Sequence, residues 1–507
     1  MIKPKNLVTH LLLIIISALI LRLTLLWPLG LNDDEAYYWM WAHMPSLSYF
    51  DNTPGAGWFL WPAINLFGDH VLVLRIYTAL SGVLTGFVIT RTVYELNPGL
   101  TERERLVVLW LATFSGVGLL TSLAWTPDTP LMLFISLGTW QFIRALNTGK
   151  SSPWLWCGIF FSLALLSKAT AGITIALAGF WMVISPHGRK QLAQPWPWIA
   201  FIFICLSLLP ILIWNLNNDW AFFKFQTGHV FDPEPGSSIS STDQKFPYWQ
   251  GLVLLLLTYP LLGGAALISA IKPGQLENSA MAAIRWIALV STVLYSLIAL
   301  YKEFPPHWAL INILLLFTLG LSKISQYKRR WYMFQFLSPL LVVIIVSAIT
   351  FWGPAVAAAK NWQNGLIWDQ IYENLREVQG RFPDSYLLAS LRYQDASQLA
   401  HKERWRWNEL PGGHAVPALN LVGRSNHYAH VWHSDTYRGA SFILLAKSRK
   451  PALKKYFCEL TPLDNIQISY RGVPIRTLYI YKATGFSGRP DVAEDRAASV
   501  DCRNQSQ

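Results

Sequence analysis

The chain has 507 residues, of which 53% are apolar and only 14% are charged, whereas about a quarter of residues are charged in ordinary soluble domains. This composition excludes a disordered chain, a disulfide scaffold and a coiled coil, and it argues against a purely soluble enzyme. The net charge of +12 would suggest nucleic-acid binding in a soluble protein, but membrane proteins also concentrate Lys and Arg on their cytoplasmic side.

The first two thirds of the chain consist of long apolar segments. A bilayer core takes about 20 apolar residues per helix, and about eleven segments approach that length. The first follows Lys3 and Lys5, but it is too long for a signal peptide and lacks a small-residue cleavage site, so it is predicted to be a retained helix. The predicted spans are 7–29, 71–94, 106–124, 131–146, 153–170, 171–186, 196–216, 249–271, 284–301, 307–322 and 331–352.

The basic residues indicate the orientation of these spans. Alternating the spans from a cytoplasmic N-terminus places fifteen of the 21 Lys and Arg residues before position 355 on the cytoplasmic side. This bias agrees with the positive-inside rule. An odd number of spans then places the C-terminal part outside the cytoplasm.

The charge density doubles after residue 354. Residues 1–354 carry 36 charged side chains and residues 355–507 carry 34, so we expect an all-α polytopic membrane domain over 1–354 and a small soluble α/β domain over 355–507. Helical periodicity covers 355–379, and strand-like runs follow at 386–391, 416–422, 441–446 and 477–481. Cys458 and Cys502 both fall in this second part, where an oxidising compartment would allow them to pair.

The segment 30–70, between the first two predicted spans, is the strongest candidate for a catalytic loop. It has no Lys or Arg, it is rich in aromatic residues, and its acids are Asp33, Asp34, Glu35, Asp51 and Asp69. Carboxyl groups beside a membrane exit with apolar neighbours can have raised pKa values and act as general bases. The alternative for residues 32–35 is a helix start, in which Asn32 or Asp33 caps the helix and acids occupy its first turn.

Cations and polar groups on the same predicted side could bind a phosphate. Lys168 lies at the outer end of an apolar span, where a charge is costly and usually functional, although its side chain could instead snorkel to the headgroups. Arg75 and His307 are weaker candidates at the starts of two other spans. Asp128 lies in a very short connection, where it either supports the site or caps the helix that begins near Pro130.

No cofactor is expected, and metal binding is considered but not expected. His229 with Asp232, and the tail histidines 427, 430 and 433, have no spacing that is specific for a metal. The sequence also has no convincing glycine-rich phosphate loop, nucleophile elbow or zinc pattern.

Several motifs resemble a known family. The first loop is similar to that of the protein O-mannosyltransferase and aminoarabinose (lipid A) transferase superfamily, which are membrane glycosyltransferases of the GT-C fold, and further matches resemble the bacterial branch of that family. The resemblance covers most of the chain, and the order of the motifs is more specific than any one of them. The matching segments are 31–39, 49–54, 126–131, 165–171, 305–308 and 423–428.

The resemblance implies a polyprenyl-phosphate sugar donor and an envelope acceptor, which could be lipid A or lipopolysaccharide, another glycan or a protein. Asp34 matches the acid that deprotonates or orients the acceptor, Asp51 matches the second loop acid, and Asp33 and Glu35 are the nearest rivals of Asp34. Relatives usually have a His or Lys after the second acid, where this chain has Asn52. The resemblance also implies a multi-pass protein of a bacterial inner membrane with a periplasmic C-terminal domain.

Two other functions fit parts of the pattern. A transporter or lipid-linked sugar flippase would suit eleven spans, but the chain has no detectable internal halves and few charges at mid-membrane. A non-catalytic envelope scaffold would tolerate neutral substitutions of Asp34. We therefore predict that the protein is an inverting membrane glycosyltransferase. It is expected to use no nucleotide sugar as donor and to bind no nucleic acid.

Overall fold

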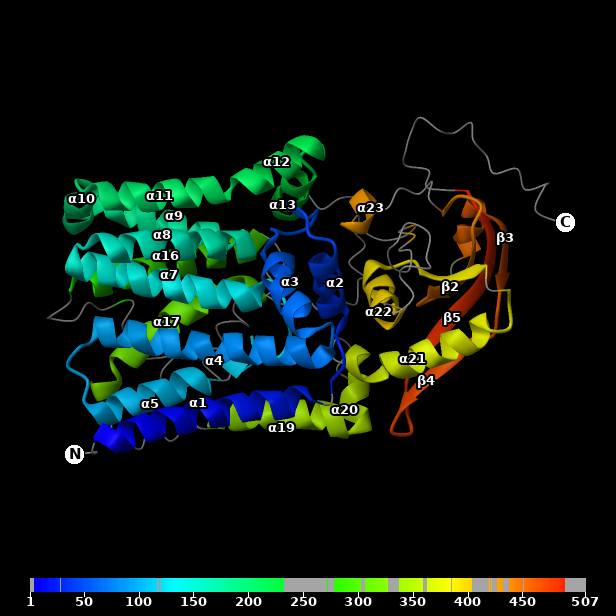
Figure 1. The fold of residues 1–507 in the computed structure, drawn as a ribbon, viewed down its shortest axis with the longest axis horizontal. Coiled ribbons are helices and arrows are strands. Elements are labelled where there is room, and N and C mark those ends of the chain that lie inside the picture. Colours follow the sequence, from blue (N-terminus) through cyan, green and yellow to red (C-terminus); the bar gives the residue numbers. More distant parts are fainter. Residues whose placement is uncertain are drawn as a thin grey trace.

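A computed structural model describes most of the chain. The described residues are 4–27, 29–115, 118–119, 121–231, 271, 278–301, 306–326, 337–358, 363–383, 385–403, 419, 421, 426–431, 437–449 and 451–487. The fold is a helical membrane domain followed by a small α/β domain, as predicted (Figure 1).

Apolar helices build the membrane domain. The predicted span 249–271 falls almost wholly outside the described residues, and each of the other predicted spans overlaps with helical structure. Buried residues of α4, α7, α8, α16 and α17 form its main core. The helices are α1 (Pro4–Leu26), α4 (Val71–Leu96), α5 (Glu102–Thr113), α7 (Asp128–Thr148), α8 (Ser151–Ser167), α9 (Ala171–Ile184), α10 (Pro186–Leu192), α11 (Pro195–Ser207), α12 (Leu209–Asn217), α13 (Ala221–Phe231), α16 (Ser279–Tyr301), α17 (Leu310–Ser322), α19 (Leu337–Phe351) and α20 (Gly353–Ala358).

Four helical segments within the described ranges are long and apolar enough to cross a membrane. They are Thr9–Leu26, Val71–Leu96, Pro195–Asn217 and Ser279–Ile298, and α9 with α10 makes a fifth if this pair, bent by 98°, is counted as one span. Three further apolar helices are shorter. By length and composition, the described residues thus account for fewer complete spans than the eleven predicted.

The predicted span 106–124 is wrong as a continuous helix, because α5 ends at Thr113. The fully buried Arg22 of α1 lies at this break. Its guanidinium donates to the carbonyls of Thr113 (2.7 Å) and Gly118 (3.3 Å) and to Ser122 Oγ (2.8 Å). These bonds satisfy backbone acceptors that a helix end leaves without partners, so a cation from another helix stabilises the interruption.

The C-terminal domain contains a five-stranded sheet with the order β1-β2-β5-β3, in which β4 also pairs with β5. Strands β1 and β2 are parallel and the other pairs are antiparallel. The predicted strands at 386, 441 and 477 are confirmed, the run 416–422 lies mostly outside the described residues, and β3, β4 and α22 were not predicted. The elements are α21 (Asn364–Gln379), β1 (Tyr386–Ser390), α22 (Tyr393–Glu403), α23 (Tyr428–Val431), β2 (Ser441–Ala446), β3 (Phe457–Pro462), β4 (Ile466–Tyr470) and β5 (Val473–Phe486).

Two short helices, α2 (Asp33–His43) and α3 (Gly55–Phe67), lie between the membrane helices and the C-terminal domain (Figure 1). Gly30 N–H donates to Gly365 O at 2.7 Å, and a Cβ on either glycine would lie under 3 Å from the other's carbonyl oxygen. Gln398 of α22 donates to Leu31 O at 2.7 Å. The C-terminal domain is therefore fixed directly to the predicted catalytic loop.

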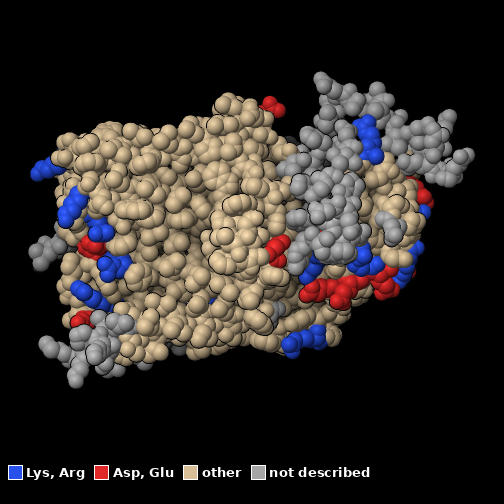
Figure 2. Space-filling view, in the orientation of Figure 1, with Lys and Arg blue, Asp and Glu red and all other residues tan. Residues whose placement is uncertain are grey.

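Charged side chains are distributed unevenly over the surface. Figure 2 shows them at the end that carries the chain's N-terminus and on the C-terminal domain, with a broad, nearly uncharged band between. Large apolar side chains along the helices of this band are exposed, including Leu13, Leu84, Phe201 and Ile344. Such a band is what a bilayer requires of the surface it covers.

Cys458 forms a disulfide, Cys157 and Cys205 are free thiols, and Cys502 lies outside the described residues.

Candidate active site

A capping box starts helix α2, as the helix-start interpretation predicted. Asn32 Oδ1 accepts from Glu35 N–H (2.8 Å), and Glu35 Oε2 accepts from Asn32 N–H (3.2 Å). Asp33, Asp34 and Glu35 therefore occupy the first turn, where their carboxylates suit the helix dipole. Consecutive helical positions point in different directions, so the three acids face three different environments.

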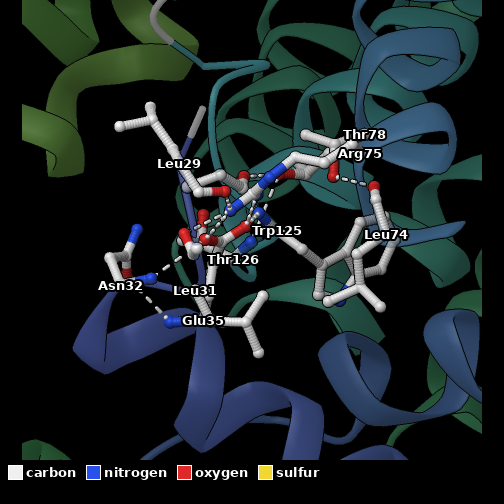
Figure 3. A network of polar contacts seen from close by, with 12 residues as sticks. Leu29, Leu31, Asn32, Glu35, Leu74, Arg75, Thr78, Trp125 and Thr126 are labelled. Atoms are coloured by element: carbon white, nitrogen blue, oxygen red, sulfur yellow. Dashed lines mark hydrogen bonds and ion pairs between the residues drawn. The ribbon is translucent and has the colours of Figure 1, made fainter. Parts of the chain in front are cut away.

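Glu35 faces inward and pairs with Arg75 of α4 (Figure 3). The side chains are 1% and 4% exposed, and Arg75 Nη2 lies 2.9 Å from Glu35 Oε2 while also donating to Gly30 O (2.7 Å). Glu35 Oε1 accepts from Arg75 Nη1 and from Trp125 N–H (2.8 Å). The pair joins α2, α4 and the connection before α7, so both predicted site residues have partners inside the protein.

Asp33 faces the C-terminal domain. Its carboxylate accepts from Asn364 Nδ2 (2.7 Å) and Trp368 Nε1 (3.3 Å) of α21. Lys447 Nζ lies 3.8 Å from Asp33 and 3.5 Å from the buried Asp395 of α22. Burial raises the pKa of Asp33, and nearby arginines oppose this effect. Asp33 thus belongs to a buried polar cluster between the two domains.

This cluster predicts a pH dependence of stability. Burial raises the pKa of Asp395, the Asp33 charge raises it further, and Arg392 and Arg476 oppose the shift. A raised folded-state pKa means that the folded state holds the proton longer, so its stabilisation is complete below about pH 4 and is lost as the pH rises. In Asp395→Asn we expect a flatter dependence of the melting temperature on pH between pH 4 and 8. An unchanged slope would contradict this assignment.

Asp34 is the exposed acid of the three. Burial raises the pKa of the Tyr38 hydroxyl well above its ordinary value, and the charges of Asp34, Asp51 and Asp128 raise it further. The Tyr38 phenol, which stays protonated at neutral pH, is therefore under the influence of three acids from separate segments. Asp51 is bonded to Tyr37, which lies three positions after Asp34 on α2.

Asp51 is held by the other tyrosine of α2 and by the C-terminal domain. Tyr37 Oη donates to Asp51 Oδ1 (3.1 Å) and accepts from His427 N–H (2.9 Å). The Tyr37 ring is buried and lies 4.5 Å from the Tyr393 ring between centroids. Gln226 of α13 donates to the Asp51 backbone carbonyl at 3.0 Å. A segment almost 400 residues away thus helps to orient a predicted site residue.

Lys168 and Asp128 form a largely buried ion pair at the same end of the bundle. Lys168, the residue that follows α8, places Nζ 2.7 and 2.9 Å from the two Asp128 oxygens. The alternative that Asp128 caps its helix is wrong, because Pro127 occupies the N-cap position and no side chain caps α7. His307 is exposed on the turn before α17, and the charges of Lys168 and Asp128 both act on its imidazole.

Sequence reasoning missed Tyr37, Tyr38 and His427 as site residues. The tyrosines follow the acids directly, and their helical spacing places them one turn after Asp33 and Asp34; this signal was available. His427 lies in the tail motif 423–428, of which residues 423–425 fall outside the described ranges.

Only some of the candidate metal-binding residues are among those that the structure describes. Among the described residues, no group of three or more His, Cys, Asp or Glu side chains could hold a metal ion. His427 and His430 pack against Phe50 and Trp214, while His433 and residues 232–248 lie outside the described ranges.

Comparisons with known proteins agree with this architecture. The model of the dolichyl-phosphate-mannose-protein mannosyltransferase family matches residues 51–214, whereas no curated protein sequence matches the chain significantly. The fold is similar to crystal structures of ArnT from Cupriavidus metallidurans bound to undecaprenyl phosphate (13% identity) and in the apo state (12%). Each has a TM-score of 0.59 and covers 93% of this chain and 97% of that one.

The oligosaccharyltransferase AglB from Archaeoglobus fulgidus is more distantly similar, at 13% identity over 93% of this chain and 75% of that one, with a TM-score of 0.47. The chain therefore has the fold of the solved ArnT structures, and about a third of it matches the mannosyltransferase family model.

Proposed function

We propose that this protein is a membrane glycosyltransferase of the GT-C superfamily, which moves a sugar from a polyprenyl-phosphate donor to a hydroxyl or phosphate of an envelope acceptor, with inversion at the anomeric carbon. The observation that carries the proposal is a set of charged groups at one end of the bundle: Asp51, bonded to Tyr37 of the helix that begins with Asp33 and Asp34, and the Asp128–Lys168 pair. The charges of Asp34, Asp51 and Asp128 all act on Tyr38. The likeness to an ArnT structure with bound undecaprenyl phosphate supports the donor class.

The proposed reaction is a single displacement. Asp34 takes the proton of the acceptor hydroxyl, the acceptor oxygen bonds to the anomeric carbon, and the bond from that carbon to the phosphate oxygen breaks. The electron pair stays on the departing polyprenyl phosphate, where the Lys168 ammonium and the His307 imidazole stabilise the negative charge. Lys has three N–H donors, so Lys168 can bind Asp128 and a phosphate oxygen together.

The remaining candidates have supporting roles in this proposal. Asp51, oriented by Tyr37, would hold the acceptor beside Asp34. Asp33, Glu35 and Arg75 would fix the start of α2, because their side chains bind other parts of the protein. The basic end of the bundle lies opposite the C-terminal domain in Figure 2, which supports a cytoplasmic N-terminus and a site on the periplasmic side of a bacterial inner membrane.

The experiment that tests the function uses the purified chain in liposomes with a polyprenyl-phosphate sugar and an envelope lipid or glycan extract. A transferase joins the labelled sugar covalently to an acceptor and releases polyprenyl phosphate, and mass spectrometry identifies both products. A flippase changes only the side of the membrane on which the donor lies. Movement of the donor without any new covalent product would overturn the proposal.

Lys168→Gln tests the phosphate site. We expect the KM for the donor to rise roughly 10- to 100-fold, because a hydrogen bond to a charged group contributes about 1.5–3 kcal/mol. The KM for the acceptor should change little. Lys224→Gln, at an exposed position of α13, is the matched control and should behave as the wild type. An unchanged donor KM in Lys168→Gln, at normal thermal stability, would exclude this role.

A further inference from the structure

An open pocket lies beside the predicted catalytic loop, on the side of Phe50. It has a volume of about 480 Å³, which is within the usual range for sites that bind small molecules. Its walls come from the end of α2 with the following turn, from the end of α12 and from α23. The lining includes His43, Ser46, Trp214, Asn218, His427 and His430.

The chemistry of the wall favours an uncharged ligand. Within the part of the chain that the structure describes, no Lys, Arg, Asp or Glu lines the pocket, so these walls offer a phosphate or carboxylate no permanent counter-charge. Trp214 supplies an aromatic surface whose ring centroid lies 5.7 Å from that of His430, while Asn218 and Ser46 supply polar groups. Aromatic walls with a few polar groups suit ligands that have both an apolar face and hydroxyls.

His427 is a buried member of this wall with an unused hydrogen-bonding atom. It is 3% exposed, and burial, with the nearby His430, lowers its pKa to about 3, so the imidazole is neutral. Its Nδ1 accepts from Phe50 N–H (3.4 Å), which leaves the hydrogen on Nε2. Nε2 has no hydrogen-bond partner among the described residues. Such a buried donor costs about 1–3 kcal/mol. Because Nε2 has almost no accessible surface, a ligand oxygen offsets this cost only if the imidazole turns toward the pocket.

The pocket is joined directly to Asp51. Phe50, the preceding residue, bonds to His427 and stacks on His430 with ring centroids 5.1 Å apart. Tyr37 links the His427 backbone to the Asp51 carboxylate. A ligand in the pocket would therefore lie next to the segment that carries Asp51.

We propose that this pocket binds a neutral sugar ring of the acceptor, with one face against Trp214 and its hydroxyls on Asn218 and the histidines. The proposal rests on the proposed transferase function and names its acceptor as a glycan or glycolipid. The ring in the pocket is not the reacting sugar but a neighbouring residue of the acceptor. With this ring bound, the acceptor would present its reacting hydroxyl to Asp34.

Binding of methyl glycosides to the full-length protein in detergent tests the pocket without turnover. The probes are the methyl glycosides of glucose, galactose, mannose and N-acetylglucosamine, with binding followed by saturation-transfer NMR and Trp fluorescence. We expect at least one to bind the wild type and to bind about tenfold more weakly to Trp214→Leu. Asn218→Ala removes a smaller group and should also weaken binding. This variant provides the same test if Trp214→Leu does not fold.

Matched controls separate this pocket from the reaction centre. Trp220→Leu, at an exposed tryptophan outside the pocket, and Asp34→Asn should bind the glycoside as the wild type does. The proposal is overturned if no glycoside binds, if Trp214→Leu and Asn218→Ala bind normally, or if inorganic phosphate competes for the pocket. Absence of transfer by the wild type would instead refute the proposed function, whatever the glycoside result.

Discussion

Asp34→Asn is expected to lower the turnover number roughly 10²- to 10⁴-fold, the range in which a positioned general base contributes. The amide keeps the shape of the side chain but cannot take the acceptor's proton. Because Asp34 is exposed, the melting temperature should stay close to that of the wild type. The measurement is steady-state transfer from a polyprenyl-phosphate sugar by the purified enzyme, with thermal unfolding recorded on the same preparation.

The two neighbouring acids provide the controls. Asp33→Asn should retain most of the turnover, because Asp33 binds Asn364 and Trp368 of the C-terminal domain, and its cost should appear as a lower melting temperature. The assignment of the base would be wrong if Asp34→Asn stayed active while Asp33→Asn lost turnover at normal stability. The same experiment on Asp51→Asn should give a smaller loss, since Asp51 orients the acceptor without accepting its proton.

Local features of the site were predictable from sequence. The capping box depends on residues three apart, Asn32 and Glu35, so it can be recognised without knowledge of the fold. The strand at 441–446 follows from a short apolar run in a more polar region. The long apolar segments likewise predict helices, since in a membrane every backbone group must be satisfied within the segment.

Contacts between distant segments were not predictable in the same way. Asp128 and Lys168 are 40 residues apart and His427 and Tyr37 are 390 apart, and no local spacing encodes either pair. The interruption after Thr113 depends on Arg22 from another helix, so hydropathy alone predicts a continuous helix there. Arg75 was predicted as a weaker phosphate ligand because it lies at the start of a span on the same predicted side as Lys168. Its buried partner Glu35 could not be inferred from spacing.

Arg75→Met decides between these two roles of Arg75. If the residue is structural, the change leaves the Glu35 carboxylate buried without its cation, and breaking a buried pair in this way costs about 3–5 kcal/mol. We therefore expect a large fall in the melting temperature of the purified protein. The double variant Glu35→Gln with Arg75→Met should recover part of that loss, because it leaves no unpaired charge in the buried site.

Arg144→Met is the matched control, because the Arg144–Glu95 pair is much more exposed, at 39% and 29%, with a separation of 3.4 Å. Exposed pairs contribute about 0–1 kcal/mol, so this variant should unfold near the wild-type temperature. If Arg75→Met were as stable as Arg144→Met but bound the donor more weakly, Arg75 would be a phosphate ligand, as the sequence first suggested. A stability loss that the double variant partly reverses would instead assign Glu35 and Arg75 to the framework that holds Asp34 at the start of α2.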